Sequence, residues 1–179
     1  FMENCAPASY AAEAERRGLS LHDLFEEKAS ALKPGESGLV ALDWWNGNRS
    51  TLVDVDLSGL LVGATLATTA PDIYRALLES TAFGTREIIE AFTKNGVAVD
   101  SIVAAGGLPD RNPLLMQIFA DATNREYRVI RSALGGALGS AMHGAVAAGE
   151  AEGGYTDIFA AEKKMGGLKD VVYRPNPAN

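Results

Sequence analysis

The stretch DSIVAAGGLPDRNPLLMQIFADATNREYRVIR, residues 100–131, decides the fold of this chain. Its apolar run Ile102–Ala105 is typical of a buried strand and stops at Gly106-Gly107, after which we expect a short polar loop. Asn112-Pro113 then opens a helical segment, because Asn is a favoured N-cap residue and proline suits the first helical position. A second β-like run, Tyr127–Ile130, closes the unit. Strand, helix and strand in this order predict two parallel neighbours joined by a right-handed crossover.

The paired glycines mark a candidate ligand edge. In open α/β sheets, ligands bind beyond the carboxyl ends of the strands, where Gly106-Gly107 should lie. A residue without a Cβ atom lets a ligand touch the backbone and can adopt a positive φ angle. The helix that follows should bury one apolar face, made of Leu114, Leu115, Ile118, Phe119 and Ala122.

An isolated Gly-Gly after a strand is also consistent with an ordinary tight turn. The chain contains no G-x-x-x-x-G-K-[ST] phosphate-binding loop, and no G-x-G-x-x-G follows a strand. The residues alone therefore predict an α/β domain with a ligand edge, and they specify no reaction.

Three motifs resemble one enzyme family. The run AAGGLPDRNPLLMQIFADATNREYRV is similar to the adenosine-binding segment of the FGGY carbohydrate kinases, which belong to the actin/hexokinase/Hsp70 superfamily. LDWWNGNRS, residues 42–50, is similar to the same region of family members that phosphorylate ketopentoses. A third match is to the family pattern D-I-x-x-A-x-x-E, carried by Asp72, Ile73, Ala76 and Glu79.

The resemblance implies an α/β fold of the actin-like ATPase, ribonuclease H-like type, with a mixed sheet and flanking helices. It covers nearly the whole chain, but only the C-terminal half of a two-domain sugar kinase. In the family, the sugar-binding domain and the catalytic aspartate precede the position of Phe1, so we expect no catalytic residue in this chain. A start at Phe rather than Met fits a piece of a longer protein.

The resemblance also implies a nucleotide site, with ATP and Mg²⁺ as cofactors and a ketopentose such as ribulose as the second substrate. Gly106 and Gly107 would let the nucleotide approach, Asn112 would hydrogen-bond the adenosine, and Gln117 lies one helical turn further on. We expect no metal site in the chain itself. Asp54 and Asp56 could share one face of a strand, but two solvated carboxylates are the commoner explanation.

The DWWNGNR motif allows two interpretations. Asp43, Trp44, Trp45 and Arg49 could form a wall on which a sugar stacks, since tryptophan combines an apolar ring with a polar edge. Alternatively, one tryptophan fills the core and Asp43 pairs with Arg49. The family resemblance places the segment near the face that joins the two domains, which implies a role in domain closure rather than catalysis.

Composition limits the class of partner. The 179 residues suit one domain, and a net charge of −7 with scattered basic residues argues against a nucleic-acid partner. The single cysteine, Cys5, excludes an internal disulfide and is consistent with the cytoplasm. No apolar stretch is long enough to span a membrane, and we expect that the start FMENCAPASY is not a signal peptide. The sequence is compatible with a homodimer.

We divide the chain into a helical lead-in (1–34), an ATP-side domain (35–150), and a short helix with a polar tail (151–179). Helices are expected at Tyr10–Arg17, after the N-cap Ser20, at about Pro71–Lys94, at Gly135–Ala148 and near Thr156–Met165. A strand is expected at Gly38–Trp45, followed by a turn at Asn46-Gly47-Asn48 that could form a hairpin.

Several side chains are expected at the surface. His22, beside a helix cap, should be a surface histidine, and His143 lies in an Ala/Gly-rich helix that the family places at its interdomain hinge. The longest helix should pack on the sheet, with its charged residues mostly facing water. These residues are Arg75, Glu79, Arg86, Glu87, Glu90 and Lys94.

The sequence is compatible with three functions. The first is the ATP-side domain of a sugar kinase, and the second is a non-catalytic nucleotide- or sugar-binding module of the same superfamily. The third is an unrelated enzyme that binds a dinucleotide, which the missing G-x-G-x-x-G disfavours. The motifs favour the kinase.

Overall fold

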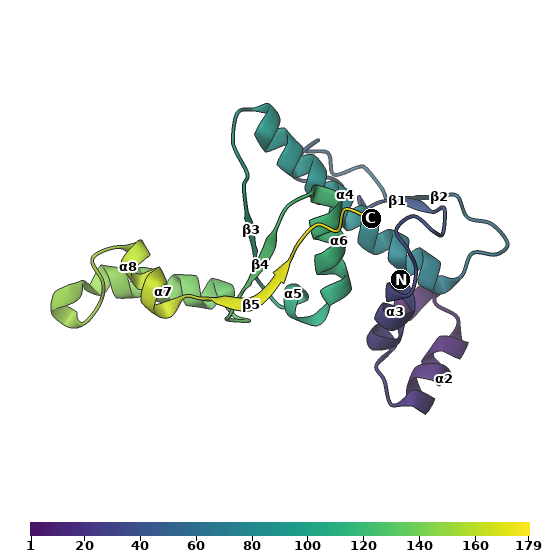
Figure 1. Ribbon diagram of the computed structural model, residues 1–179, viewed down its shortest axis with the longest axis horizontal. Helices are drawn as coiled ribbons and strands as arrows, with labels where there is room; N and C mark the ends of the chain where they lie inside the picture. The colour runs from purple at the N-terminus through teal and green to yellow at the C-terminus, as the bar shows by residue number, and fades with distance from the viewer.

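The computed structural model describes residues 1–179 and has a mixed α/β architecture with two small sheets (Figure 1). The first sheet pairs β1 (Val40–Leu42) with β2 (Leu60–Val62), and the second has the order β3 (Ile102–Ala104), β4 (Tyr127–Ile130), β5 (Leu168–Tyr173). The helices are α1 (Met2–Cys5), α2 (Ala8–Arg17), α3 (Leu21–Ser30), α4 (Ala70–Lys94), α5 (Leu108–Arg111), α6 (Pro113–Thr123), α7 (Gly135–Ala148) and α8 (Ile158–Met165), with a 3₁₀ turn, η1, at Glu150–Glu152.

The strand–helix–strand unit is confirmed. β3 and β4 are parallel neighbours, with Ile102 opposite Tyr127 and Ala104 opposite Val129. The expected polar loop after the glycines is instead the helical turn α5, because Pro109 is compatible with a first helical turn. α6 begins at Pro113 as expected.

The polar tail contains a strand that we did not predict. Within it, β5 pairs antiparallel with β4, with Tyr173 opposite Tyr127, and so makes the sheet mixed. The prediction underestimated this segment because its only apolar run, around Val171-Val172, is flanked by charged residues. The C-terminal residues then return to lie beside α6 (Figure 1).

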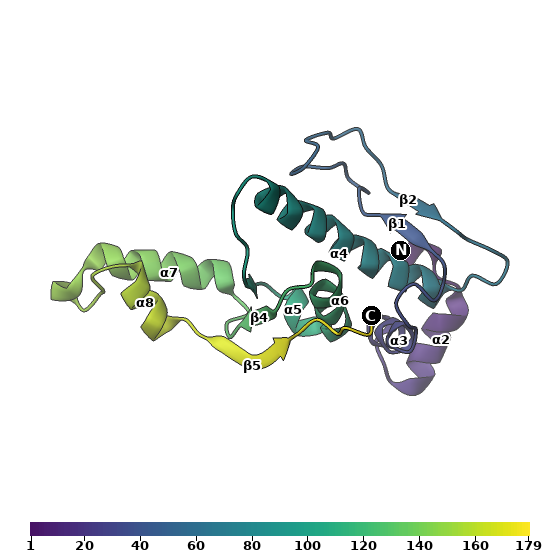
Figure 2. The ribbon, with the colours of Figure 1, turned by 45° about the horizontal axis from the view of Figure 1, so that its top comes forward.

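α6 is covered on two sides. Met116 and Ala120 form a buried cluster with Tyr127 and Val129 of β4, while α4 packs along the helix from another side (Figure 2). The predicted single face was therefore too narrow, since Met116 is 2% exposed while Ala122 is only half-buried.

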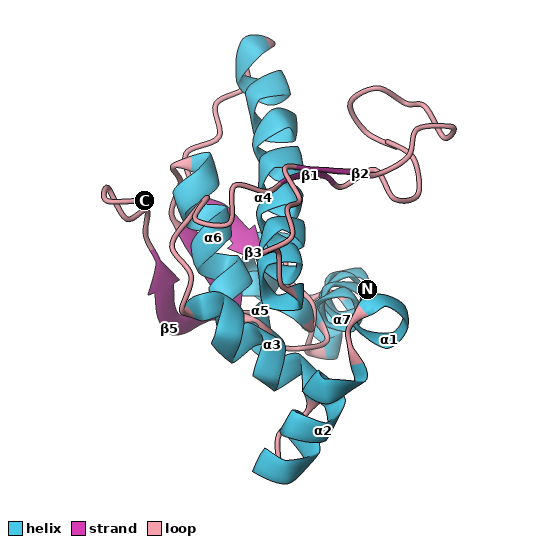
Figure 3. Cartoon of the chain, turned by 90° about the vertical axis from the view of Figure 1, so that its right-hand side faces the viewer, coloured by secondary structure: helices cyan, strands magenta, loops and turns pink.

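The long helix α4 is the centre of the molecule. It contacts α6, α3 and β1, and thus packs on the small β1–β2 sheet rather than on the sheet of β3–β5 (Figures 2 and 3). Thr69 precedes it, and the Asp72 carboxylate accepts hydrogen bonds from the Thr69 backbone N–H (2.7 Å) and hydroxyl (2.6 Å). These bonds fix the start of the helix. No helix of the chain is long and apolar enough to cross a membrane.

The lead-in helices pack on α4. Phe25 and Ala29 of α3 form a buried cluster with Ala70 and Tyr74 of α4. The predicted helix ends are confirmed by Gly18, which has φ +67° after α2, and by Ser20, whose hydroxyl accepts the Asp23 backbone N–H. The lead-in therefore contributes to the same core as α4.

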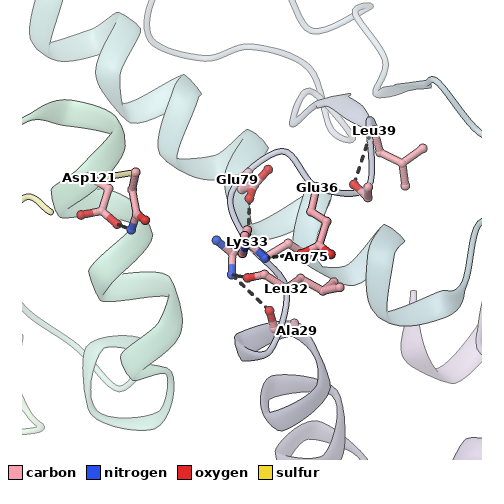
Figure 4. A network of polar contacts seen from close by, with 10 residues as sticks. Ala29, Leu32, Lys33, Glu36, Leu39, Arg75, Glu79 and Asp121 are labelled. Carbon is pink, nitrogen blue, oxygen red and sulfur yellow. Dashed lines mark hydrogen bonds and ion pairs between the residues drawn. The ribbon is translucent and has the colours of Figure 1, made fainter. Parts of the chain in front are cut away.

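Two charged residues of α4 are buried, which corrects the expectation that both face water. Arg75 and Glu79 are 6% and 7% exposed, and Arg75 Nε donates to Glu79 Oε1 at 2.7 Å (Figure 4). Arg75 Nη1 also donates to the carbonyls of Ala29 and Leu32, both at 3.1 Å. Burial is possible because the charges are paired and the carbonyls at the end of α3 need donors.

The segment of α7 and α8 projects from the rest of the chain (Figures 1 and 2). The two helices pack on each other, with Met142 and Ala161 buried. His143 is exposed on α7.

Candidate functional site

The two glycines at the end of β3 form an open corner. Gly106 has φ +101°, a conformation that strongly favours glycine, whereas Gly107 has φ −79° and ψ −20°, which any residue can adopt. A Cβ atom built on either residue would meet no atom of the chain within 4 Å. Bare main chain is therefore exposed at the rim of the sheet.

A hollow of about 780 Å³ lies beside this corner. One wall comes from the start of α3 and the other from the corner and α5. The lining residues are Ser20, His22, Asp23, Gly107, Leu108, Asp110, Arg111 and Asn112. The α3 wall is brought to the corner because α3 packs on α4, which in turn packs on α6.

Asn112 occupies a buried position at the base of this hollow. Its side chain caps α6, with Oδ1 accepting the Leu115 N–H at 2.8 Å, and its Nδ2 donates to Tyr74 Oη at 3.3 Å. The residue is 1% exposed. Both ends of the carboxamide thus have partners inside the chain, so a bond to adenosine would use the second Nδ2 hydrogen or the carbonyl's spare lone pair, or replace one of these partners.

Gln117 does not line the hollow. Its Nε2 donates to Asp121 Oδ1 and to the Arg174 carbonyl, both at 2.8 Å, and so joins α6 to the C-terminal segment. The structure therefore brings Gly107 and Asn112 to one site, with Gly106 adjacent in the chain, and places Gln117 beside the C-terminal segment.

Two residues were not predicted as part of this site: His22, which lines the hollow, and Tyr74, which contacts His22. Tyr74 Oη lies 3.3 Å from His22 Nδ1, and the two rings meet edge to face with centroids 5.9 Å apart. Burial raises the pKa of Tyr74, so its phenol stays protonated at neutral pH. His22 is exposed as predicted, but its contact with Tyr74 spans 52 residues, and no local pattern signals it.

The DWWNGNR motif lies over a different part of α4. Two adjoining hollows, of about 370 and 270 Å³, share Asp43, Trp44 and Gly84 in their walls, and Arg49 lines the smaller one. A Cβ on Gly84 would lie 2.5 Å from Asp43 Oδ2, so the glycine makes room for this carboxylate. Asp43, Trp44 and Arg49 are therefore neighbours of one cleft.

The alternative pairing of Asp43 with Arg49 is not present, since no ion pair joins the two residues. Trp45 is 59% exposed with its ring over Gly59 and does not fill the core, whereas Trp44 is half-buried. The expected local hairpin is also wrong, because β1 pairs with the distant β2 and the backbone of Asn48 pairs with that of Asp54.

No group of three His, Cys, Asp or Glu side chains is arranged to hold a metal ion. Asp54 Oδ1 accepts the Asp56 backbone N–H at 2.9 Å, a local turn. The lining of the hollow beside the glycines includes His22, Asp23 and Asp110, which are not gathered to hold a metal ion.

Comparison with known proteins assigns the family. Residues 4–148 match the family model "FGGY family of carbohydrate kinases, C-terminal domain". The chain is 53% identical over 179 residues to a ribulokinase from Geobacillus thermodenitrificans, covering 100% of this chain and 32% of the relative. It is 57% identical over 177 residues to a ribulokinase from Halalkalibacterium halodurans, covering 99% and 31%. This chain belongs to the FGGY family of carbohydrate kinases.

The fold agrees with this assignment. The crystal structure of a xylulose kinase from Rhodospirillum rubrum superposes with a TM-score of 0.72 and 27% sequence identity, over 96% of this chain and 32% of that chain. The predicted actin-like ATPase fold is thereby confirmed. The chain spans about a third of the length of the relatives it matches.

Proposed function

We propose that this chain is the ATP-binding C-terminal part of a sugar kinase that transfers the γ-phosphate of ATP to a ketopentose such as ribulose. The observation that carries the proposal is the open space beside the main chain at Gly107. Neither its backbone conformation nor any neighbouring atom of the chain requires a glycine there, yet a side chain would project over the open corner. An external group that lies against the main chain explains the missing side chain.

The division of labour follows from the residues present. Phosphoryl transfer needs positioning, charge neutralisation and a base for the attacking hydroxyl. The chain supplies the nucleoside side through Gly106, Gly107 and Asn112, with Gln117 bracing α6. Mg²⁺ would neutralise phosphate charge, and since no group of three His, Cys, Asp or Glu side chains gathers in this chain, we assign its contacts to ATP and to other parts of the kinase.

The cleft of Asp43, Trp44 and Arg49 is proposed as the side that meets the sugar-binding domain when the kinase closes. Its support is that Asp43 and Arg49 have no ion-pair partner in the chain and that Trp45 is exposed beside them. A homodimer is also compatible with the apolar side chains exposed on the small sheet, which are Val40, Leu42, Leu60 and Val62. A cytoplasmic location accompanies the proposal, since that is where ATP is available.

Isothermal titration with ATP and Mg²⁺, combined with a coupled kinase assay on ribulose, tests the proposal. We expect weak saturable binding of ATP by the 179-residue chain, and turnover only in the longer kinase. Absence of nucleotide binding would refute the site, and robust turnover by this chain alone would refute the division of labour.

A further inference from the structure

We propose that His22 is a nucleoside-binding residue, which forms the wall opposite the glycine corner and donates its Nε2–H to the bound nucleoside. The inference rests on the proposed nucleotide site and adds a residue to it. His22 lines the same hollow as Gly107, although the two residues lie 85 positions apart in the chain. A ligand that lies on the corner therefore faces the imidazole.

The Tyr74 hydroxyl, which is held by Asn112, fixes the orientation of the His22 ring. Asn112 is fixed by capping α6, and its Nδ2 donates to Tyr74 Oη. The Tyr74 hydroxyl, which already accepts this hydrogen, is left to donate its own to His22 Nδ1 at 3.3 Å. This assignment of hydrogens satisfies every member of the chain Asn112–Tyr74–His22.

The same network selects the tautomer. Because Nδ1 accepts from a phenol that burial keeps protonated, the neutral imidazole carries its proton on Nε2. Nε2 points away from Tyr74 and has no partner within the chain. The Nε2–H of His22 is thus a hydrogen-bond donor at the wall of the hollow. Asn112, which caps α6, determines the position of this donor through Tyr74.

The hollow carries no excess positive charge that would attract the phosphates of a ligand. Asp23 and Asp110 both line it, and Arg111 is the one lining residue of opposite charge. Asp110 is also paired with Lys169 at 2.7 Å. The two carboxylates and the two cations balance, so the hollow offers a triphosphate no net attraction, whereas the nitrogen and oxygen acceptors of a purine nucleoside match an N–H donor.

The test compares ATP with adenosine, which lacks the phosphates, on the 179-residue chain. His22→Ala should weaken the binding of both ligands by about five- to tenfold, the effect of one hydrogen bond. His22→Gln, which keeps a donor, should retain most of the affinity, and His22→Phe, which keeps only the ring, should not. His143→Ala, at the exposed histidine of α7, is the matched control and should bind ATP like the parent chain.

Tyr74→Phe tests the positioning role. It should reduce the affinity for both ATP and adenosine, because the hydroxyl that holds His22 is lost. Equal ATP affinity of His22→Ala and the parent chain would overturn the role of His22 alone, as would a loss for ATP that adenosine does not share. Failure of the parent chain itself to bind ATP would overturn the proposed nucleotide site as well.

Discussion

Arg75 and Glu79 form an ion pair inside the contact between α3 and α4, and each is less than 10% exposed. Arg75 also satisfies two backbone acceptors at the end of α3, since its Nη1 donates to the carbonyls of Ala29 and Leu32. Glu79 belongs to the D-I-x-x-A-x-x-E pattern, so one residue of this family motif acts by holding the arginine that joins two helices.

Removal of one partner of this buried ion pair should lower the free energy of unfolding. Glu79→Ala leaves the Arg75 guanidinium buried and without its counter-ion, and we expect a loss of about 3 kcal/mol in the free energy of unfolding. Chemical denaturation of the variant and the parent chain measures this difference. Arg86 and Glu90 provide the control, because they share the spacing and the 2.7 Å Nε–Oε1 distance but their side chains are 57% and 38% exposed. Glu90→Ala should have a much smaller effect, and equal losses for the two variants would show that burial does not matter here.

A second prediction concerns the C-terminal segment. Asp121 of α6 accepts the Asn176 backbone N–H at 2.8 Å and the Asn179 side-chain amide at 2.6 Å. Asp121→Ala should therefore increase hydrogen exchange at residues 174–179 while the amides of β5 that pair with β4 stay protected. Asp170→Ala, at an exposed position of β5, should leave both regions unchanged. Unaltered exchange at 174–179 in the Asp121 variant would contradict the anchoring role.

Acid should weaken the connection between β4 and the C-terminal segment. Glu126 accepts from Arg128 Nε at 2.8 Å and lies 3.2 Å from Arg174 Nε. The hydrogen bond from Arg128, aided by the charges of both arginines, lowers the pKa of Glu126. The folded-state pKa then lies below the unfolded one, so the stabilisation is present above the unfolded pKa and is lost as pH falls through the folded pKa.

Thermal melting of the parent chain and of Glu126→Gln across this pH range checks the sign. The difference in Tm should be present at neutral pH and should shrink toward zero in acid. A difference that grows as pH falls would contradict the direction of the pKa shift.

What the sequence could predict was local. Ser20, Asn112 and Gly18 act within one helical turn, and the helix ends they mark are confirmed. The parallel pairing of β3 and β4 was also predictable, because a short strand–helix–strand unit allows few arrangements.

Contacts between distant residues were not predictable. Arg75 reaches a carbonyl 46 residues away, and burial of its charge depends on where α3 packs. The pairing of β5 with β4 and the approach of His22 to Tyr74 depend on the same tertiary packing. The sequence therefore predicted the glycine corner, but it did not predict that His22 of α3 lies on the other side of the hollow.

The two glycines of the corner should respond differently to the same substitution. Gly106→Ala forces a side chain into φ +101° and should cost about 1–3 kcal/mol of stability. Gly107→Ala places a methyl group in open space at φ −79°, so stability should be unchanged within about 1 kcal/mol. ATP affinity should nevertheless fall at least several-fold in Gly107→Ala, because the methyl group occupies the surface against which the nucleoside lies. Denaturation and ATP titration of both variants measure the two effects separately, and a Gly107→Ala chain that binds ATP like the parent would place the nucleotide elsewhere.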